Sequence, residues 1–229
     1  MPAYRSEAEA EIRGPVVEHL RQMIPNCRII HEINACGFGN RIDVLAVGLS
    51  EIAAVEIKSE KDKLDRLPDQ IKAMQGVAHR VYAAIHEKFL TQSHHSDDVY
   101  PPEQASRAIV WVYPKAERKG HVECRTDWKV CGWNDRRKSC LPDAAIHILW
   151  REELQAICRA LGVPRAGSLV MEDAIDAIRW QMTGEQITRE ICRALRARQC
   201  PEADAPISDD VGISDATRFT NSAAREAKT

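Results

Sequence analysis

The chain has 229 residues, of which 44% are hydrophobic and 29% charged, and its formal net charge is −2. This length allows one sizeable core with a smaller appendage. No apolar run approaches the roughly 18 residues of a membrane span, and no charged-then-apolar secretory leader precedes the first predicted helix. We therefore expect a cytoplasmic protein without a membrane partner. The chain as a whole is not basic, so a nucleic-acid ligand would need local basic patches.

Near the N-terminus, apolar residues recur at helical spacing and mark one face of a predicted helix: Ile12, Val16, Val17, Leu20 and Ile24. At about 100° per residue, Glu9 falls near the middle of this face. An inward carboxylate is either a functional residue or an ordinary first-turn acid that complements the helix dipole. A break in the helix at Gly14-Pro15 is the alternative, because proline lacks the backbone N–H donor.

Two short apolar runs follow in R-I-D-V-L-A-V-G-L-S-E-I-A-A-V-E-I-K-S and predict a β-hairpin. The predicted turn is centred between Leu49 and Ser50. This register places Asp43 directly opposite Glu56, where Cβ atoms lie about 4.5–5.5 Å apart. Side chains alternate between the faces of a strand, so Lys58 lies on the same face as Glu56. The sequence therefore predicts that two carboxylates and an ammonium meet at one end of an apolar hairpin.

Burying these charges is costly unless they are paired or bind a metal ion. Mg²⁺ is usually held by one or two carboxylates, with water and substrate phosphate in the remaining positions. Lys58 would then orient the attacking water and offset the charge that develops on the phosphate. The other interpretation, a hairpin with a solvated charged face, is disfavoured by the apolar neighbours of the carboxylates. The pattern thus predicts a Mg²⁺ site at Asp43 and Glu56.

Downstream, Pro68 predicts the start of a helix that runs to Ala78 and carries Gln70 in its first turn. The run from Arg80 to Ile85 forms the next predicted strand. A hairpin followed by strand, helix and strand favours a mixed sheet flanked by helices, which places the chain in the α/β class.

The C-terminal part is predominantly helical. Residues 142–161 contain a helix that ends at Gly162, a typical C′ glycine. A second helical pattern covers residues 168–182, and the sequence from Thr183 to Gln186 predicts a capping box that opens a third helix. The polar face of that third helix either contacts a DNA backbone or remains solvated, and it carries Arg189, Arg193 and Arg196.

Composition changes again near residue 200, after which Ala, Asp, Ser and Glu predominate. Such a segment buries too little apolar surface to fold and predicts a disordered tail. The chain therefore divides into a core at residues 1–145, a helical subdomain at 146–199 and a tail at 200–229.

Residues 115–138 hold eight basic and four acidic residues, with Trp128 and Trp133 among them. Such a segment suits phosphate contacts and stacking on unpaired bases, or it forms a polar hairpin with its tryptophans packed inward. Potential zinc ligands occur in or next to it: His121, Cys124, Cys131 and Cys140. They lack the paired C-x-x-C spacing of typical zinc sites, and scattered reduced thiols are the other interpretation.

In its residues Asp43 and Glu56-Ile57-Lys58, the chain resembles the signature of the PD-(D/E)xK phosphodiesterase superfamily. The fold of that superfamily is restriction-endonuclease-like. Ile42 stands where that family often has proline. The similarity extends through the helix S-E-A-E-A-E-I-R and the run E-I-K-S-E-K-D-K-L-D-R-L-P-D-Q, which is followed by R-V-Y-A-A-I. The sequence W-R-E-E-L further on is similar to the C-terminal part of the same branch. These segments point to a little-characterised bacterial and prophage branch of the superfamily.

The resemblance implies a Mg²⁺-dependent nuclease that acts on DNA and in which Mn²⁺ can replace Mg²⁺. Asp43 and Glu56 would bind the metal together with the backbone carbonyl of Ile57. Glu9 would complete the coordination directly or through water.

The resemblance also carries over a catalytic role for Lys58 and for Gln70, although an ordinary polar first-turn residue is the other interpretation of Gln70. It implies a role in DNA repair, recombination or the processing of phage and mobile-element DNA, and it leaves a homodimer open. Three alternatives remain: a DNA-binding module that keeps the fold with weak catalysis, an enzyme that acts on RNA, and a zinc-stabilised interaction protein.

Overall fold

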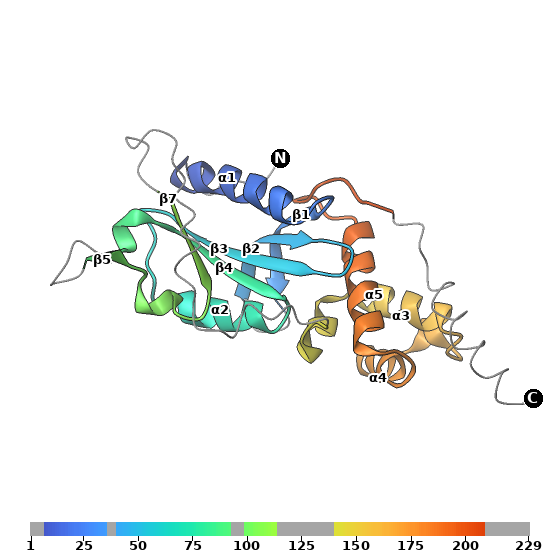
Figure 1. Ribbon diagram of the computed structural model, residues 1–229. Helices are drawn as coiled ribbons and strands as arrows, with labels where there is room; N and C mark the ends of the chain where they lie inside the picture. Colours follow the sequence, from blue (N-terminus) through green and yellow to red (C-terminus); the bar gives the residue numbers. More distant parts are fainter. Residues whose placement is uncertain (1–6, 36–39, 93–98, 114–139, 209–229) are drawn as a thin grey trace, which may run out of the picture.

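The two apolar runs around Gly48 form adjacent antiparallel strands in a computed structural model, which describes residues 7–35, 40–92, 99–113 and 140–208. These strands lie at the centre of a five-stranded mixed sheet, with helices on both faces and at one end (Figure 1). The predicted α/β class with a mixed sheet flanked by helices is confirmed.

The sheet has the order β1-β2-β3-β4-β7, with the bounds Arg28–Ala35, Asn40–Val47, Ile52–Lys58, Arg80–His86 and Ile109–Tyr113. β1, β2 and β3 are antiparallel neighbours, whereas β4 and β7 run parallel to β3. Val44 of β2 pairs with Val55 of β3, so the hairpin has the register predicted from the sequence. A separate two-stranded sheet consists of β5 (Thr91–Gln92) and β6 (Val99–Tyr100).

Both faces of the central strands are apolar because a helix covers each of them. α1 (Glu7–Met23) packs Val16 against one face, and α2 (Leu67–Gln75) packs Met74 against the other (Figure 1). Every residue of β3 is buried as a result. No helix in the described part of the chain is long and apolar enough to cross a lipid bilayer.

Helix α1 runs through Gly14-Pro15 without a break. Both residues are exposed, so the missing N–H donor of Pro15 weakens only the solvent side of the helix. The helical phase is therefore kept from Glu9 onward, and Val16 and Leu20 are buried as predicted.

Helix α2 begins at Leu67, next to the predicted Pro68, and ends at Gln75, before the predicted end at Ala78. Gly76 forms its C-cap. Glycine is a poor helix former, which accounts for the earlier end.

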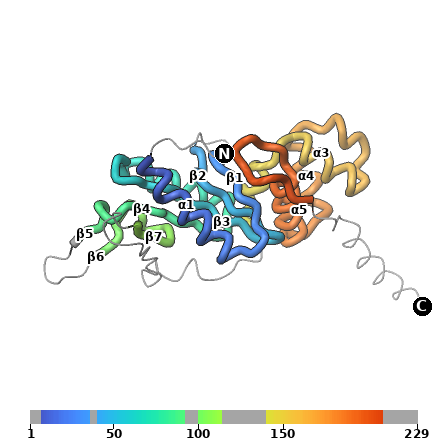
Figure 2. Tube along the Cα trace, turned by 90° about the horizontal axis from the view of Figure 1, so that it is seen from above, coloured from blue at the N-terminus to red at the C-terminus, as the bar shows by residue number. Residues whose placement is uncertain are grey.

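The C-terminal helices are α3 (Arg151–Ala160), α4 (Met171–Gln181) and α5 (Gly184–Ala197), and they lie together at one end of the sheet (Figure 2). The predicted glycine after the first of them, Gly162, has a left-handed φ of 75°. Thr183 and the third residue after it form the predicted capping box of α5.

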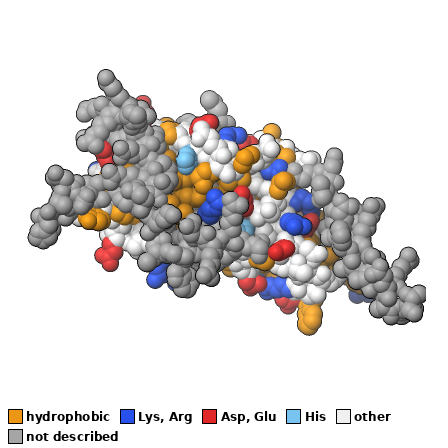
Figure 3. Space-filling view, viewed as in Figure 1, with side chains coloured by type: hydrophobic (Ala, Val, Ile, Leu, Met, Phe, Trp, Pro, Cys, Tyr) orange, Lys and Arg blue, Asp and Glu red, His pale blue; other side chains and the backbone are white. Residues whose placement is uncertain are grey.

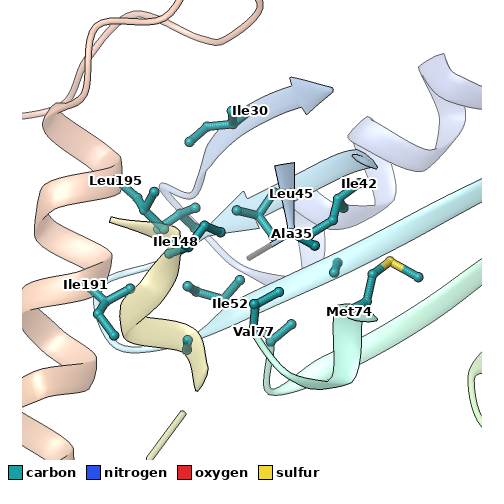
Figure 4. Packing of buried hydrophobic residues seen from close by; sticks show 14 of the residues in the cluster. Ile30, Ala35, Ile42, Leu45, Ile52, Met74, Val77, Ile148, Ile191 and Leu195 are labelled. Atoms are coloured by element: carbon teal, nitrogen blue, oxygen red, sulfur yellow. The ribbon is translucent and has the colours of Figure 1, made fainter. Parts of the chain in front are cut away.

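These helices share one hydrophobic core with the sheet. Figure 4 shows Ile191 and Leu195 of α5 facing Ile148 and the sheet residues Leu45 and Ile52. The boundary predicted near residue 146 therefore separates two kinds of secondary structure within a continuous core.

Buried arginines attach α5 to the sheet. Arg28 of β1 donates hydrogen bonds to the carbonyls of Leu195 and Arg196, at 2.7 and 2.9 Å. These carbonyls belong to the last turn of α5, whose carbonyls have no donor within the helix. Arg196 in turn donates to the carbonyls of Asn26 and Val47, at 2.7 and 3.2 Å. Arg196 is thus buried against the sheet, whereas helical periodicity placed it on the outer, polar face of α5.

The chain beyond α5 lies along the free edge of β1. The N–H of His31 donates to the carbonyl of Glu202 at 2.7 Å, and the N–H of Asp204 donates to the carbonyl of Ile29 at 2.9 Å. Composition predicts a disordered tail here, but backbone pairing with β1 places its first residues. Residues 209–229 lie outside the described residues.

We expect Arg28→Ala to lower the free energy of unfolding by about 2–3 kcal/mol, because it removes two buried hydrogen bonds to the last turn of α5. The Arg196 carbonyl keeps the N–H of Ile207 as a donor, whereas the Leu195 carbonyl keeps none among the described residues. Urea denaturation followed by circular dichroism measures the change. Arg189→Ala, on the exposed side of α5, is the control and should leave the midpoint unchanged. An unchanged midpoint for Arg28→Ala as well would show that these bonds do not hold α5 in place.

Candidate active site

Asp43, Glu56 and Lys58, which we call the charged cluster, lie where β2 and β3 separate. Continuing the β2–β3 register by one residue beyond its last pair places Asp43 opposite Glu56. The ammonium of Lys58 donates a 2.7 Å hydrogen bond to Oε1 of Glu56. The backbone N–H of Ile57 donates a 2.8 Å bond to Oδ2 of Asp43. The fold thus brings together the three side chains that the hairpin register predicts to meet.

All three side chains of the charged cluster are buried: Asp43 is 7%, Glu56 2% and Lys58 8% exposed. Burial raises the pKa of the Asp43 carboxyl. Burial together with the neighbouring charge of Asp43 raises the pKa of Glu56 to about 8, although hydrogen bonds from Lys58 and Gln70 act in the opposite direction. Two carboxylates held this close repel each other when both are ionised.

Two acceptor oxygens at the cluster receive no hydrogen bond from the part of the chain that the structure describes. Gln70, in the first turn of α2, donates from its amide nitrogen to Oε1 of Glu56. Oε2 of Glu56 and Oε1 of Gln70 are buried and have no hydrogen-bond partner among the described residues. Buried polar atoms are normally satisfied, so a ligand that accepts lone pairs would complete this site.

The available atoms fit a hard divalent cation. Mg²⁺ prefers carboxylate and carbonyl oxygens and keeps several waters. A strand residue directs its N–H and C=O toward the same neighbour, so the bond from the Ile57 amide to Asp43 implies that the Ile57 carbonyl also faces β2. No group of three or more His, Cys, Asp or Glu side chains forms a metal cage within the described ranges. The candidate ligands at this site are Asp43, Glu56 and the Ile57 carbonyl, and water would fill the other positions around such a cation.

Glu9 faces inward from α1, as helical phase predicts, with its side chain 12% exposed. Its carboxylate forms an ion pair with Arg13, one turn further along α1. Arg13 donates a 2.8 Å bond to the backbone carbonyl of Asp43. Glu9 is therefore connected to the charged cluster through Arg13.

Arg13 is a residue that the sequence pattern did not single out. It is 1% exposed and donates to Oε1 of Glu32 at 2.9 Å, in addition to Glu9 and Asp43. Its guanidinium also lies 3.1 Å from Nδ1 of His31. One buried cation thus joins α1, β1 and β2 beside the charged cluster. The sequence feature that could have identified Arg13 is its i,i+4 spacing from Glu9 on an otherwise apolar helix face.

Glu32 was also missed. It falls between His31 and Ile33, which pair with Val44 and Ile42 on either side of Asp43, and its φ of 55° is left-handed. That conformation costs a non-glycine residue about 1–2 kcal/mol. Ion pairs from Arg13 and from Arg41, the latter at 2.8 Å, hold the Glu32 side chain in place. No local sequence signal marks this strained position.

The predicted basic and tryptophan-bearing segment, residues 115–138, lies outside the described residues, as do His121, Cys124 and Cys131 of the predicted zinc set. Cys140 is described and is half-buried. On the face seen in Figure 3, acidic and basic side chains are interspersed over the described surface.

Comparison with known proteins gives one similarity. A family model described as bacteriophage P4 protein cII matches residues 3–103, which is less than half of the chain. The match includes the charged cluster together with Glu9, Arg13, Glu32 and Gln70, and it ends before β7 and the C-terminal helices. No curated protein and no solved structure gave a significant match.

Arg13→Met should lower the free energy of unfolding by about 3 kcal/mol, because it leaves the carboxylates of Glu9 and Glu32 buried without their shared cation. Arg41→Met is the matched control, since Arg41 pairs with the same Glu32 but is 49% exposed. Urea denaturation in the presence of a chelator compares the two variants. Equal losses of stability would contradict a special role for the buried guanidinium.

Proposed function

We propose that this protein is a Mg²⁺-dependent nuclease that hydrolyses phosphodiester bonds in DNA. The observation that carries the proposal is the buried Oε2 of Glu56, to which no described residue donates a hydrogen bond. This oxygen lies in a cluster with Asp43 and the ammonium group of Lys58. A purely structural ion pair would satisfy its carboxylate oxygens, because buried unpaired acceptors are costly. A site that receives a cation and a phosphate needs such oxygens.

The carboxylates of Asp43 and Glu56 and the carbonyl of Ile57 are the atoms that would hold the cation, and Mn²⁺ would substitute for Mg²⁺. When bound, the ion supplies charge neutralisation at the phosphate and lowers the pKa of bound water. Glu9 contributes to the site by holding Arg13, and Arg13 fixes the backbone of Asp43.

Lys58 has three N–H donors, and one of them is used by Glu56. The other two are available to orient the attacking water and to donate to a non-bridging phosphate oxygen, whose negative charge increases in the transition state. Oε1 of Gln70, which has no donor among the described residues, can accept a hydrogen bond from the same water. The side chains thus divide into cation ligands and groups that position water.

Membership of the PD-(D/E)xK superfamily is part of this proposal. Helix, hairpin and glutamine-bearing helix occur in the order that the sequence resemblance implies. The similarity of residues 3–103 to a phage protein supports a role in the processing of phage or mobile-element DNA, in repair or in recombination.

Lys58→Ala should reduce the rate of DNA cleavage by about 10²–10³-fold, the loss expected when a group that stabilises developing charge is removed. The assay incubates the purified protein with linear, circular, single-stranded and branched DNA, and with RNA, in Mg²⁺, Mn²⁺ or chelator. Lys61→Ala, an exposed lysine beside the site, is the control and should retain activity.

Full cleavage by Lys58→Ala protein would contradict the assigned role. Binding of DNA without cleavage by the native protein under every metal condition would favour the alternative, a catalytically weak DNA-binding module. Cleavage of RNA alone would identify an RNA enzyme.

Asp43→Asn should abolish the heat of Mn²⁺ binding in isothermal titration calorimetry, because it removes the negative charge of one proposed ligand. Asp69→Asn, an exposed acid in the first turn of α2, should titrate as the native protein does. An unchanged Mn²⁺ isotherm for Asp43→Asn would exclude Asp43 as a ligand independently of any activity measurement.

A further inference from the structure

A cavity of about 420 Å³ lies between β1 and the C-terminal helices, and we call it the β1 cavity. Its size falls in the range of small-ligand sites, about 300–1,000 Å³. Apolar side chains form much of its wall, among them Ile33, Leu149 and Met171. Asn34 and Glu202 add polar groups that can form hydrogen bonds. This composition is typical of a binding site for a largely apolar ligand with a polar edge.

Trp150 supplies a flat aromatic wall to the β1 cavity. Its side chain is 51% exposed, and the guanidinium of Arg198 lies 4.4 Å from the centroid of its ring. Arg198 is itself fixed, because Nε donates to Glu153 at 2.7 Å and Nη2 donates to the carbonyl of Ile148 at 2.9 Å. A fixed cation therefore backs the ring, and the exposed part of the ring is available for stacking.

The charges that line the β1 cavity do not suit a phosphate group. Arg198 is the only lysine or arginine among the described lining residues, and its guanidinium is already bonded. Glu32 and Glu202 also line the cavity, and carboxylates repel phosphate. Burial lowers the pKa of His31 to about 4, so this lining ring is neutral near neutral pH. The cavity favours a flat ligand without negative charge.

A nucleobase meets these requirements. Bases of any sequence stack on aromatic side chains, and an exocyclic amino group donates hydrogen bonds to a carboxylate. Glu202 can accept such bonds, since no cation pairs with its carboxylate in the described part of the chain.

Glu32 and Arg13 connect the β1 cavity to the candidate active site. Glu32 lines the cavity and belongs to β1, the neighbour of the strand β2 that carries Asp43. Arg13 contacts both residues, through Oε1 of Glu32 at 2.9 Å and the carbonyl of Asp43 at 2.8 Å. A strand that places a phosphate at the charged cluster therefore has this cavity as its neighbour on the β1 side.

We propose that the β1 cavity binds an unpaired nucleobase of the DNA strand whose phosphate lies at the charged cluster, with the base stacked on Trp150. The inference rests on the proposed nuclease function and narrows its substrate to DNA with unpaired bases: single strands, frayed ends or extruded nucleotides. A fully paired duplex has no base to insert.

The test measures binding of a fluorescein-labelled single strand to the full chain by fluorescence anisotropy, with a chelator present to prevent cleavage. Trp150→Ala should weaken binding about tenfold, within the range for one stacked base, whereas Trp150→Phe keeps a ring and should lose less. The backbone N–H of Trp150 caps α3 through a 2.7 Å bond to Glu153, and neither substitution removes it. Trp180→Ala is the control, because Trp180 is 89% exposed and lies outside the cavity lining.

An otherwise identical strand with abasic sites should bind native and Trp150→Ala protein equally, and a duplex should bind more weakly than the single strand. Equal affinity of native and Trp150→Ala protein for the intact strand would overturn the proposal. Native protein that binds abasic and intact strands equally would overturn it too. Displacement of the strand by low concentrations of free deoxyadenosine monophosphate would identify a site for free nucleotides instead.

The same proteins assayed with Mg²⁺ distinguish this inference from the proposed nuclease function. If Trp150→Ala protein binds and cleaves DNA as the native protein does, the base site is excluded and the proposed nuclease function stands. If binding depends on Trp150 but the native protein cleaves no DNA, the base site stands and the proposed nuclease function is excluded.

Discussion

Asp43 and Glu56 are buried side by side at the point where β2 and β3 separate. Burying two carboxylates costs free energy, and the neighbouring groups act to reduce that cost. Burial raises the pKa of both carboxyls, and their mutual repulsion adds to the effect at Glu56. Hydrogen bonds from Lys58, Gln70 and the Ile57 amide offset part of the cost. The offset is incomplete, because one Glu56 oxygen has no donor in the described structure. This oxygen is the feature on which the proposed cation site depends.

The opposite side of Asp43 depends on a second buried charge. Arg13 holds the Asp43 backbone from α1 and pairs with Glu9 and Glu32. Glu32 keeps a left-handed backbone in the middle of a strand, a strain that a fold retains only where surrounding contacts impose it. The ion pairs around Arg13 are those contacts. They connect the charged cluster to β1 and, through Glu32, to the β1 cavity.

The C-terminal helices pack into the same hydrophobic core as the sheet and do not form an independent unit. Their apolar side chains enter the core of the sheet, and Arg28 and Arg196 exchange hydrogen bonds across the junction with backbone carbonyls. The chain beyond α5 then pairs with the edge of β1. One consequence is that Trp150 and Arg198 line the same cavity as Glu32 of β1.

Local periodicity was enough to determine the α/β class, the register that sets Asp43 opposite Glu56, the inward direction of Glu9 and the capping box of α5. These features depend on residues close in the sequence, whose alternation or helical phase is set by backbone geometry. Arg13 as a shared cation, the strained Glu32, the burial of Arg196 and the ordered start of the tail depended on partners far away in the chain. Only the tertiary structure decided them, because a charged side chain is buried or solvated according to which distant groups the packed fold offers it.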